Sequence, residues 1–240
     1  MSLSKICLLA VVATLTFSSL SAQADSLTLG SVYSGNVPAS STAGDIVFEY
    51  VGSKQFEVAG AGNFTGTTAI VNGKPVSFSA VYCVDLFDTI SLGSTYDATF
   101  TTTGMVNGSP VNNAAQIAWL ITNLAPDATT TEENMGLQAA IWATEYDGTN
   151  GTPIFDFLAG DNSAAVDAAF FADIAALGHN SASINSVDWI SSTSGSGSDK
   201  TNNQGLVGLV NSPVPEPATL SLLGTGILGI AGLLRRHLSA

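Results

Sequence analysis

Cysteine and histidine are scarce in this 240-residue chain, and their scarcity excludes several kinds of site. Between residues 25 and 213 there are one cysteine and one histidine, too few for a zinc site built from these ligands, so we expect no metal and no cofactor. His179 follows the end of a predicted helix, without the sequence context of a catalytic triad. We therefore expect no enzyme that turns over, and a hydrolase would need a pocket holding a carboxylate pair.

Basic residues are also few. Between residues 25 and 213 there are three lysines, no arginine and 18 acidic residues, which gives a net charge near −15. Without a basic patch to neutralise phosphates, nucleic acid is excluded as a partner. The charge is typical of a soluble, self-repelling surface protein.

Two further patterns are absent. The chain shows neither an alternation of strands with helices nor a glycine-rich phosphate loop, which argues against a doubly wound nucleotide-binding fold. The acidic pairs Asp85/Asp88 and Glu132/Glu133 could bind calcium, but no ligand loop of the usual spacing surrounds them. We interpret them as solvated charges.

The first 24 residues have the pattern of a secretory signal peptide. Lys5 precedes an apolar run over 6–17, and small residues end the segment, so we expect cleavage after Ala24. Cys7 is removed with this segment. No cysteine stands directly after the cleavage site, so a lipoprotein is not indicated.

The other end of the chain has the pattern of a membrane helix. The 17 apolar residues 218–234 rise about 25 Å as a helix, near the lower limit for crossing a bilayer. Arg235 and Arg236 follow and would stay in the cytoplasm. The alternative is a buried C-terminal helix of a soluble domain, but such a helix is seldom apolar all round and then followed by two arginines.

Residues 213–240 resemble the PEP-CTERM sorting signal of Gram-negative bacteria. The resemblance lies in Pro215-Glu216-Pro217, the short apolar span and the basic end. It implies that a membrane peptidase of the exosortase type recognises these three residues, cuts nearby and removes the helix. It also implies an intermediate anchored in the inner membrane, followed by the cell surface or the extracellular matrix of a biofilm.

Residues 25–212 predict one mainly β domain, a sandwich or barrel, with a late insertion of about three helices. The dipeptide Asn72-Gly73 predicts a hairpin turn, because both residues tolerate positive φ angles, and a second Asn-Gly occurs at 107–108. Helical periodicity begins at 112, and residues 191–203 read as a Ser/Gly loop before a last strand.

Capping residues mark the predicted helices. Thr130 and Glu133 form a capping box for the second helix. Asn162 or Ser163 caps the third helix, which Gly178 ends.

Cys83 is the one cysteine that remains after signal cleavage, and an unpaired cysteine is unusual in an exported protein. Four interpretations stay open: a small buried hydrophobe, an intermolecular disulfide, a nucleophile, or a link to a residue other than cysteine. The apolar neighbours Val81, Tyr82 and Val84 favour burial, which weakens the disulfide interpretation.

The fourth interpretation has a specific candidate partner. A thiolate can attack a glutamine carboxamide, expel ammonia and leave an internal thioester, provided that water is kept out. Gln138 opens an apolar helical stripe and is the candidate acyl donor. Tyr82 and Trp142 are the candidate side chains that would shield the bond.

The two segments together resemble the thioester domains of bacterial surface adhesins. The resemblance lies in Tyr82-Cys83-Val84 and in the helical stretch 137–142, with its Gln-x-x-Ile-Trp pattern. It implies that Cys83 and Gln138 form the bond, whose carbonyl passes to a target nucleophile. Gln116 is a rival donor, but it lacks an Ile-Trp pair at the matching spacing.

We therefore expect an exported protein that attaches covalently to an extracellular target bearing an amine or a hydroxyl group. Each molecule would react once. The alternative is a non-covalent structural or binding protein of the exopolysaccharide matrix, with an inert buried Cys83.

Overall fold

The computed structural model describes residues 24–32, 45–50, 56–60, 62–151, 154–195 and 200–211. Nearly all of the predicted signal peptide, and the predicted membrane helix at 218–234, lie outside these ranges. Among the helices of the described ranges, none combines the length and the hydropathy that a bilayer crossing requires.

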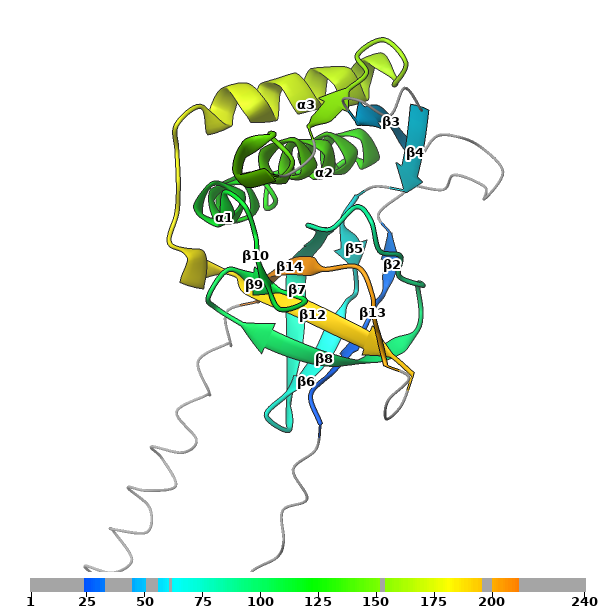
Figure 1. Ribbon diagram of the computed structural model, residues 1–240, viewed down its shortest axis with the longest axis vertical. Helices are drawn as coiled ribbons and strands as arrows, with labels where there is room; N and C mark the ends of the chain where they lie inside the picture. The colour runs from blue at the N-terminus through cyan, green and yellow to red at the C-terminus, as the bar shows by residue number, and fades with distance from the viewer. Residues whose placement is uncertain are drawn as a thin grey trace, which may run out of the picture.

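Six antiparallel strands form a closed barrel (Figure 1). The ring closes because β12 pairs with β8 on one side and with β14 on the other. None of these six strands is therefore left at the edge of an open sheet. In ring order the strands are β1 (Ser26–Thr28), β6 (Thr68–Val71), β7 (Lys74–Cys83), β14 (Leu206–Val210), β12 (Asp188–Ser194) and β8 (Thr95–Thr101).

Two Asn-Gly turns shape the hairpins. Asn72 and Gly73, with φ angles of 51° and 74°, join β6 to β7. Asn107 and Gly108, with φ angles of 51° and 80°, join the short strands β9 (Met105–Val106) and β10 (Ser109–Pro110). The hairpin predicted at Asn72-Gly73 is confirmed.

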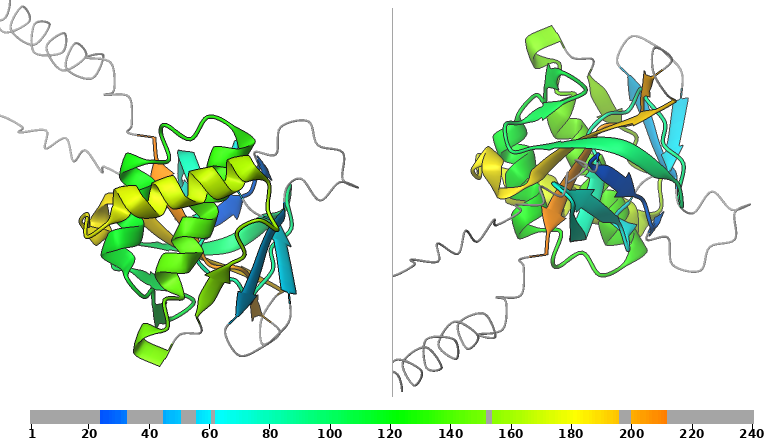
Figure 2. Two further views of the ribbon diagram at one scale, coloured as in Figure 1. Left: turned by 90° about the horizontal axis from the view of Figure 1, so that it is seen from above. Right: turned by 90° about the horizontal axis from the view of Figure 1, so that it is seen from below.

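Three helices cover one end of the barrel: α1 (Ala114–Asn123), α2 (Thr131–Glu145) and α3 (Ala164–Leu177). Figures 1 and 2 show α2 between the barrel and α3, with α1 beside it. Since α2 is covered on both sides, its middle, residues 134–142, is buried all round. The expected fold class, mainly β with a late block of three helices, is confirmed, and the sheet is a barrel.

Smaller pairings flank the barrel. Strands β3 (Asp45–Tyr50), β4 (Phe56–Gly60) and β11 (Phe155–Phe157) form a three-stranded sheet beside α2. Strand β2 (Ser31–Val32) pairs with β5 (Phe64–Thr65), and β13 (Thr201–Asn202) pairs with the end of β12. Two 3-10 turns, η1 (Thr149–Gly151) and η2 (Ile184–Ser186), complete the described elements.

The predicted loop at 191–203 is wrong over much of its length. Ser191 to Ser194 continue β12, and the first three of them pair with β8 through the register Ser191↔Thr99 to Thr193↔Asp97. Composition misled the prediction, because Ser and Thr are common in loops but also fit a strand that has partners on both sides.

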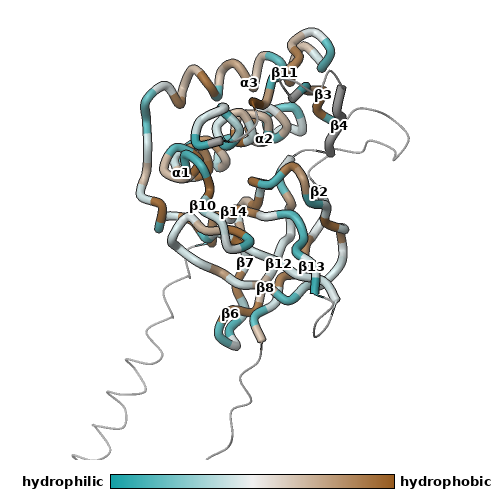
Figure 3. Tube along the Cα trace, in the orientation of Figure 1, coloured by the Kyte–Doolittle hydropathy of each residue, from teal (hydrophilic) through white to brown (hydrophobic). Residues whose placement is uncertain are grey.

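The core fills the barrel and continues beneath the helices. Figure 3 shows apolar residues gathered where the barrel meets the helical layer. The largest fully buried side chains are Trp142, Trp189, Tyr82, Leu27, Leu29, Ile46, Ile117, Leu120, Ile121, Leu137, Ile141 and Ile190.

Strand β7 connects the two ends of the barrel. Near its start, Ser77 accepts a hydrogen bond from the backbone N–H of Asn211, just after β14. In the same region Ser26 pairs with Ile70 on the neighbouring β6. The other end of β7 is Cys83, which lies beneath α2.

Candidate functional site

Cys83 and Gln138 contact each other through two reciprocal hydrogen bonds. The backbone N–H of Cys83 donates to Gln138 Oε1 at 2.8 Å, and Gln138 Nε2 donates to the carbonyl oxygen of Cys83 at 2.7 Å. A neighbouring strand would make the same pair of hydrogen bonds with the backbone of Cys83. On its other side Cys83 pairs with Leu206 of β14. The carboxamide of Gln138 therefore continues the sheet at the point where β7 has lost β6 as a neighbour.

Both residues are shielded from solvent. Gln138 is 0% exposed and Cys83 is 2% exposed. Burial, and then the nearby charge of Asp85, raise the pKa of the Cys83 thiol well above its usual value. The thiol is free of any disulfide and keeps its proton at neutral pH.

Strand register fixes the directions of the neighbouring side chains. Cys83 shares a face with Leu206, and Leu206 shares it with Ile190, inside the barrel. Tyr82 projects to the opposite face, where its hydroxyl donates to Asn134 Oδ1 of α2 at 2.6 Å. The Cys83 side chain therefore leaves the strand toward the barrel interior, while Tyr82 anchors the helix.

Local sequence explains why α2 lies where it does. The capping box of Thr130 and Glu133 is formed in both directions and fixes the first turn. One residue later, Asn134 donates to Ala128 O and Thr130 O, while its Oδ1 accepts from Tyr82. The start of the helix is thus tied to β7 one turn before Gln138.

The close packing of α2 against α3 depends on Gly136. A Cβ at this position would lie 2.5 Å from Ala169 Cβ and 2.7 Å from the backbone nitrogen of Phe170. A glycine inside a helix usually costs stability, but here it permits the approach of α3 that buries α2.

Trp142 lies one turn after Gln138 and is fully buried. Its ring packs against Phe48 and Phe155, at centroid distances of 6.2 and 6.1 Å. Within the described residues its Nε1 has no hydrogen-bond partner. Tyr82 and Trp142 thus both lie in the dry layer around Gln138, one from the strand and one from the helix.

The other sequence-based candidates lie elsewhere. Gln116 is on α1, and none of the described hydrogen bonds joins its side chain to Cys83. His179 follows α3 in an exposed position. Glu133 is used in the capping box. The described residues contain no group of three acidic, histidine or cysteine side chains that could hold a metal ion.

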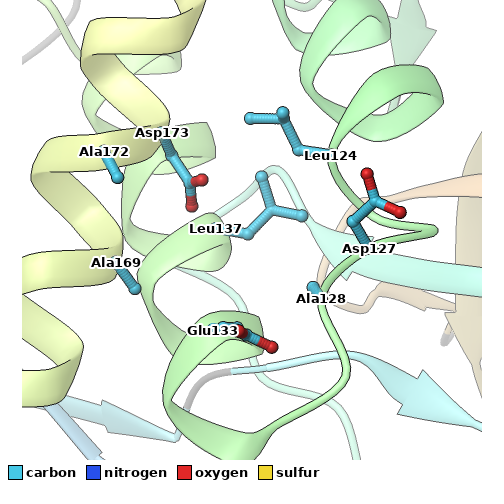
Figure 4. Close-up of a pocket in the computed structure, with 8 residues that line it drawn as sticks. All are labelled: Leu124, Asp127, Ala128, Glu133, Leu137, Ala169, Ala172 and Asp173. Carbon is cyan, nitrogen blue, oxygen red and sulfur yellow. The ribbon is translucent and has the colours of Figure 1, made fainter.

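One pocket lies on the outer side of α2. It has a volume of about 270 Å³, and Figure 4 shows Asp173 reaching from α3 toward Leu137, with Leu124 and Asp127 on the opposite wall. Burial, and then Glu133, raise the pKa of Asp173 to about 7. None of the unpartnered buried atoms of the described residues belongs to the polar side chains of this pocket.

A second pocket adjoins the Cys83 end of β7, with a volume of about 190 Å³. Val84, the residue after Cys83, contributes to its wall, as do Asp85 and Asp88. Sequence reasoning missed the contributions of Asn107 and Glu145. A signal did exist for Glu145, because it follows Gln138 by seven residues and so shares its helix face.

Comparison with known proteins identifies one segment. The PEP-CTERM protein-sorting motif matches residues 213–236, which lie outside the described part of the structure and include Pro215, Glu216 and Pro217. The motif marks an exported surface protein that exosortase, a membrane peptidase, recognises and processes. Neither the curated proteins nor the solved structures yielded a match.

Proposed function

We propose that this exported, exosortase-processed chain attaches covalently to an extracellular target through an internal thioester between Cys83 and Gln138. The observation that carries the proposal is the reciprocal pair of hydrogen bonds at 2.8 and 2.7 Å. These bonds hold the acyl donor against the residue that bears the nucleophile, in a place that excludes water.

The orientation of the carboxamide supports the reaction. Because Gln138 pairs edge-on with the backbone of Cys83, the two faces of its carbonyl point above and below the sheet. Side chains of a strand project in those same directions. A sulfur on Cys83 can therefore approach the carboxamide carbon across a face, as attack on a carbonyl requires.

The chemistry balances with groups of the chain alone. The Sγ–Cδ bond forms, the Cδ–Nε2 bond breaks, and the thiol proton leaves on the nitrogen as ammonia. In the second step an amine of the target attacks Cδ, the C–S bond breaks, and a proton from the nitrogen restores the thiol. A hydroxyl would react in the same way to give an ester. Each molecule acts once, so the protein is not an enzyme that turns over.

Burial protects the thiol before the reaction and the thioester after it. A thioester in water hydrolyses, whereas Tyr82 and Trp142, both 0% exposed, belong to the dry surroundings of the pair. The raised pKa of Cys83 also keeps the free thiol neutral and therefore slow to oxidise before the bond forms.

The second candidate function is a non-covalent structural or binding protein of the extracellular matrix. This function is favoured because both polar atoms of the Gln138 carboxamide are hydrogen-bonded. A fully paired carboxamide can be buried without taking part in any reaction. In that case Gln138 replaces a missing strand and Cys83 is an inert core residue.

Intact mass of the exported protein decides between the two functions. Loss of ammonia makes the protein about 17 Da lighter than its sequence, and Cys83→Ala and Gln138→Glu should each abolish that deficit. The matched control is Gln116→Glu, which should keep it. Full mass, with one thiol titratable after denaturation, would establish the non-covalent function.

A further inference from the structure

The two Asn-Gly turns of the chain have nearly the same backbone but different surroundings. Asn72 and Asn107 both have a φ angle of 51°, and each is followed by a glycine with a positive φ angle. The carboxamide of an asparagine is open to attack by the next backbone nitrogen, and a following glycine favours this attack because it has no Cβ to hinder the approach. The surroundings of the two side chains therefore decide which site reacts.

Asn107 is held by segments that are distant in sequence. Its backbone N–H donates to Ser191 Oγ at 2.7 Å, and its Nδ2 donates to the carbonyl oxygen of Asn203 at 3.0 Å. Its Oδ1 is closed off from solvent and, like Glu145 Oε2 in the same pocket, has no hydrogen-bond partner among the described residues. Attack on this carboxamide would break the bond of Nδ2 and place negative charge on an enclosed oxygen, so the site is protected.

Asn72 is exposed at the tip of the β6–β7 hairpin, which Figure 1 shows at the end of the barrel away from the helices. Its backbone N–H donates to Asp25 Oδ1 at 2.7 Å, whereas none of the hydrogen bonds among the described residues uses its carboxamide. A Cβ at Gly73 would meet nothing within 4 Å, so the space around the glycine is open as well. The carboxamide of Asn72 can therefore turn toward the nitrogen of Gly73.

We propose that Asn72 is a site of spontaneous modification, at which the carboxamide closes onto Gly73 and is then converted into an acid. The backbone nitrogen of Gly73 attacks Asn72 Cγ, the N–Cγ bond forms, the Cγ–Nδ2 bond breaks, and the Gly73 amide proton leaves on Nδ2 as ammonia. Water then opens the succinimide ring at either carbonyl and leaves an aspartate or an isoaspartate at position 72. This inference does not depend on the proposed function.

The isoaspartate product no longer fits the turn. Its main chain runs through the side-chain carbon, so the loop between Val71 and Lys74 gains one backbone atom. A two-residue hairpin loop has a fixed geometry that matches the twist of its strands. The added atom therefore disturbs the pairing of Val71 with Lys74.

Asp25 connects this change to the closure of the barrel. Its carbonyl oxygen accepts a hydrogen bond from the N–H of Ala98 on β8 at 3.0 Å, directly before β1 begins. The three residues of β1 make it the shortest strand of the ring, and it lies between β6 and β8. In either product the new carboxylate at position 72 lies close to the carboxylate of Asp25 and repels it. The modification therefore loosens β1.

The reaction is tested by ageing the exported protein in mildly alkaline buffer and mapping its peptides by tandem mass spectrometry. Chymotryptic peptides 65–78 and 101–119 carry Asn72 and Asn107. We expect conversion of the amide to an acid to be at least about fivefold faster at Asn72, because Asn107 must first lose its hydrogen bond. In urea, where both side chains lose their surroundings, the two rates should become similar.

Asn72→Gly is the matched control, because a Gly-Gly turn keeps the favoured geometry and has no carboxamide. Its peptide 65–78 should not change with age. The inference is overturned if Asn107 converts as fast as Asn72 in the folded protein. It is equally overturned if Asn72 keeps its amide over a period in which the chain unfolded in urea converts.

Hydrogen exchange measures the effect on the strand. The amide of Ala98 should exchange at least about fivefold faster in the aged protein than in aged Asn72→Gly, since local opening of β1 exposes it. The amide of Val207, on β14, is the internal control and should exchange equally in the two proteins. Equal exchange at Ala98 would overturn the effect on β1.

The succinimide is lighter than the sequence by the mass of ammonia, as a thioester is, and variants separate the two. A deficit of about 17 Da that is lost in Asn72→Gly belongs to the succinimide, and one that is lost in Gln138→Glu belongs to the thioester. Each deficit is measured without the other, so the failure of one assignment leaves the other standing.

Discussion

The side chain of Gln138 pairs with the backbone of Cys83 as a strand would, and this pairing connects the helical layer to the barrel. The arrangement has a structural consequence that does not depend on any reaction. It satisfies two buried backbone groups at the end of β7, where β6 no longer reaches.

Loss of the Gln138 carboxamide should therefore destabilise the fold even without a thioester. In the Cys83→Ala background, Gln138→Leu leaves the N–H and C=O of residue 83 unpaired, and we expect a loss of about 2–5 kcal/mol in the free energy of unfolding. Urea denaturation measures it. The control Gln116→Leu on α1 should stay within about 0.5 kcal/mol of its parent, and equal effects of the two changes would contradict the role of the pairing.

Tyr82 has two separable roles, which Tyr82→Phe distinguishes. The substitution removes the hydroxyl that donates to Asn134 at 2.6 Å but keeps the ring. We expect a loss of about 1–3 kcal/mol in the free energy of unfolding, because Asn134 Oδ1 loses this donor. The mass deficit should remain, since the ring still excludes water. A lost deficit with unchanged stability would show that the hydroxyl, not the ring, matters for the bond.

The sign of the stability change caused by Gly136→Ala tests the close approach of α2 and α3. Helix propensity alone predicts a gain of roughly 1 kcal/mol for Ala over Gly inside a helix. The added Cβ would meet the backbone of α3 at 2.7 Å, so we expect instead a net loss of about 1–3 kcal/mol. Thermal unfolding measures the sign, and a higher melting temperature would show that α3 can move away at little cost.

Stability should fall as the pH rises from 5 to 8. The pKa values of Glu145 and Asp173 are raised to about 7 in the fold, whereas those of unfolded carboxyls lie near 4. Between these limits the folded chain binds more protons than the unfolded chain, so each rise in pH favours unfolding. The melting temperature should be higher at pH 5 than at pH 8.

The acidic groups near these two carboxyls also raise their pKa values, which leads to the same pH dependence of stability. Glu145 faces Asp85 and Asp147, and Asp173 faces Glu133 and the neutral hydroxyl of Tyr82. Asp173→Asn should reduce the pH dependence, whereas the control Glu132→Gln should leave it unchanged. A melting temperature that rises from pH 5 to pH 8 would contradict the assignment.

Local signals in the sequence were sufficient for much of the fold. Asn72-Gly73 predicted its turn because few residues tolerate two positive φ angles, and Thr130 with Glu133 predicted the start of α2. Closure of the barrel could not be predicted, since it depends on the pairing of β12 with β8, about ninety residues away in sequence. The Ser and Thr residues of β12 gave no apolar alternation from which to recognise a strand.

The candidate site could also be predicted only in part from the sequence. A lone cysteine and a glutamine in an apolar helical stripe were visible in the sequence, and the fold places them in contact, while the bond between them stays a prediction. The orphaned oxygens of Asn107 and Glu145 were not visible, because an unpaired acceptor is a property of the packed chain. The only sequence signal was the position of Glu145, seven residues after Gln138 on the same helix face.

The direction of β7 also determines which end of the barrel lies near the sorting motif. The chain leaves the barrel at Asn211 beside Ser77, two residues before the sorting motif begins, and Cys83 lies six residues further along β7, about 20 Å away at the rise of a strand. If the chain is held at that motif, the end of the barrel at Asn211 lies nearest the point of attachment, and the end that carries the helical layer over Cys83 and Gln138 lies farther away.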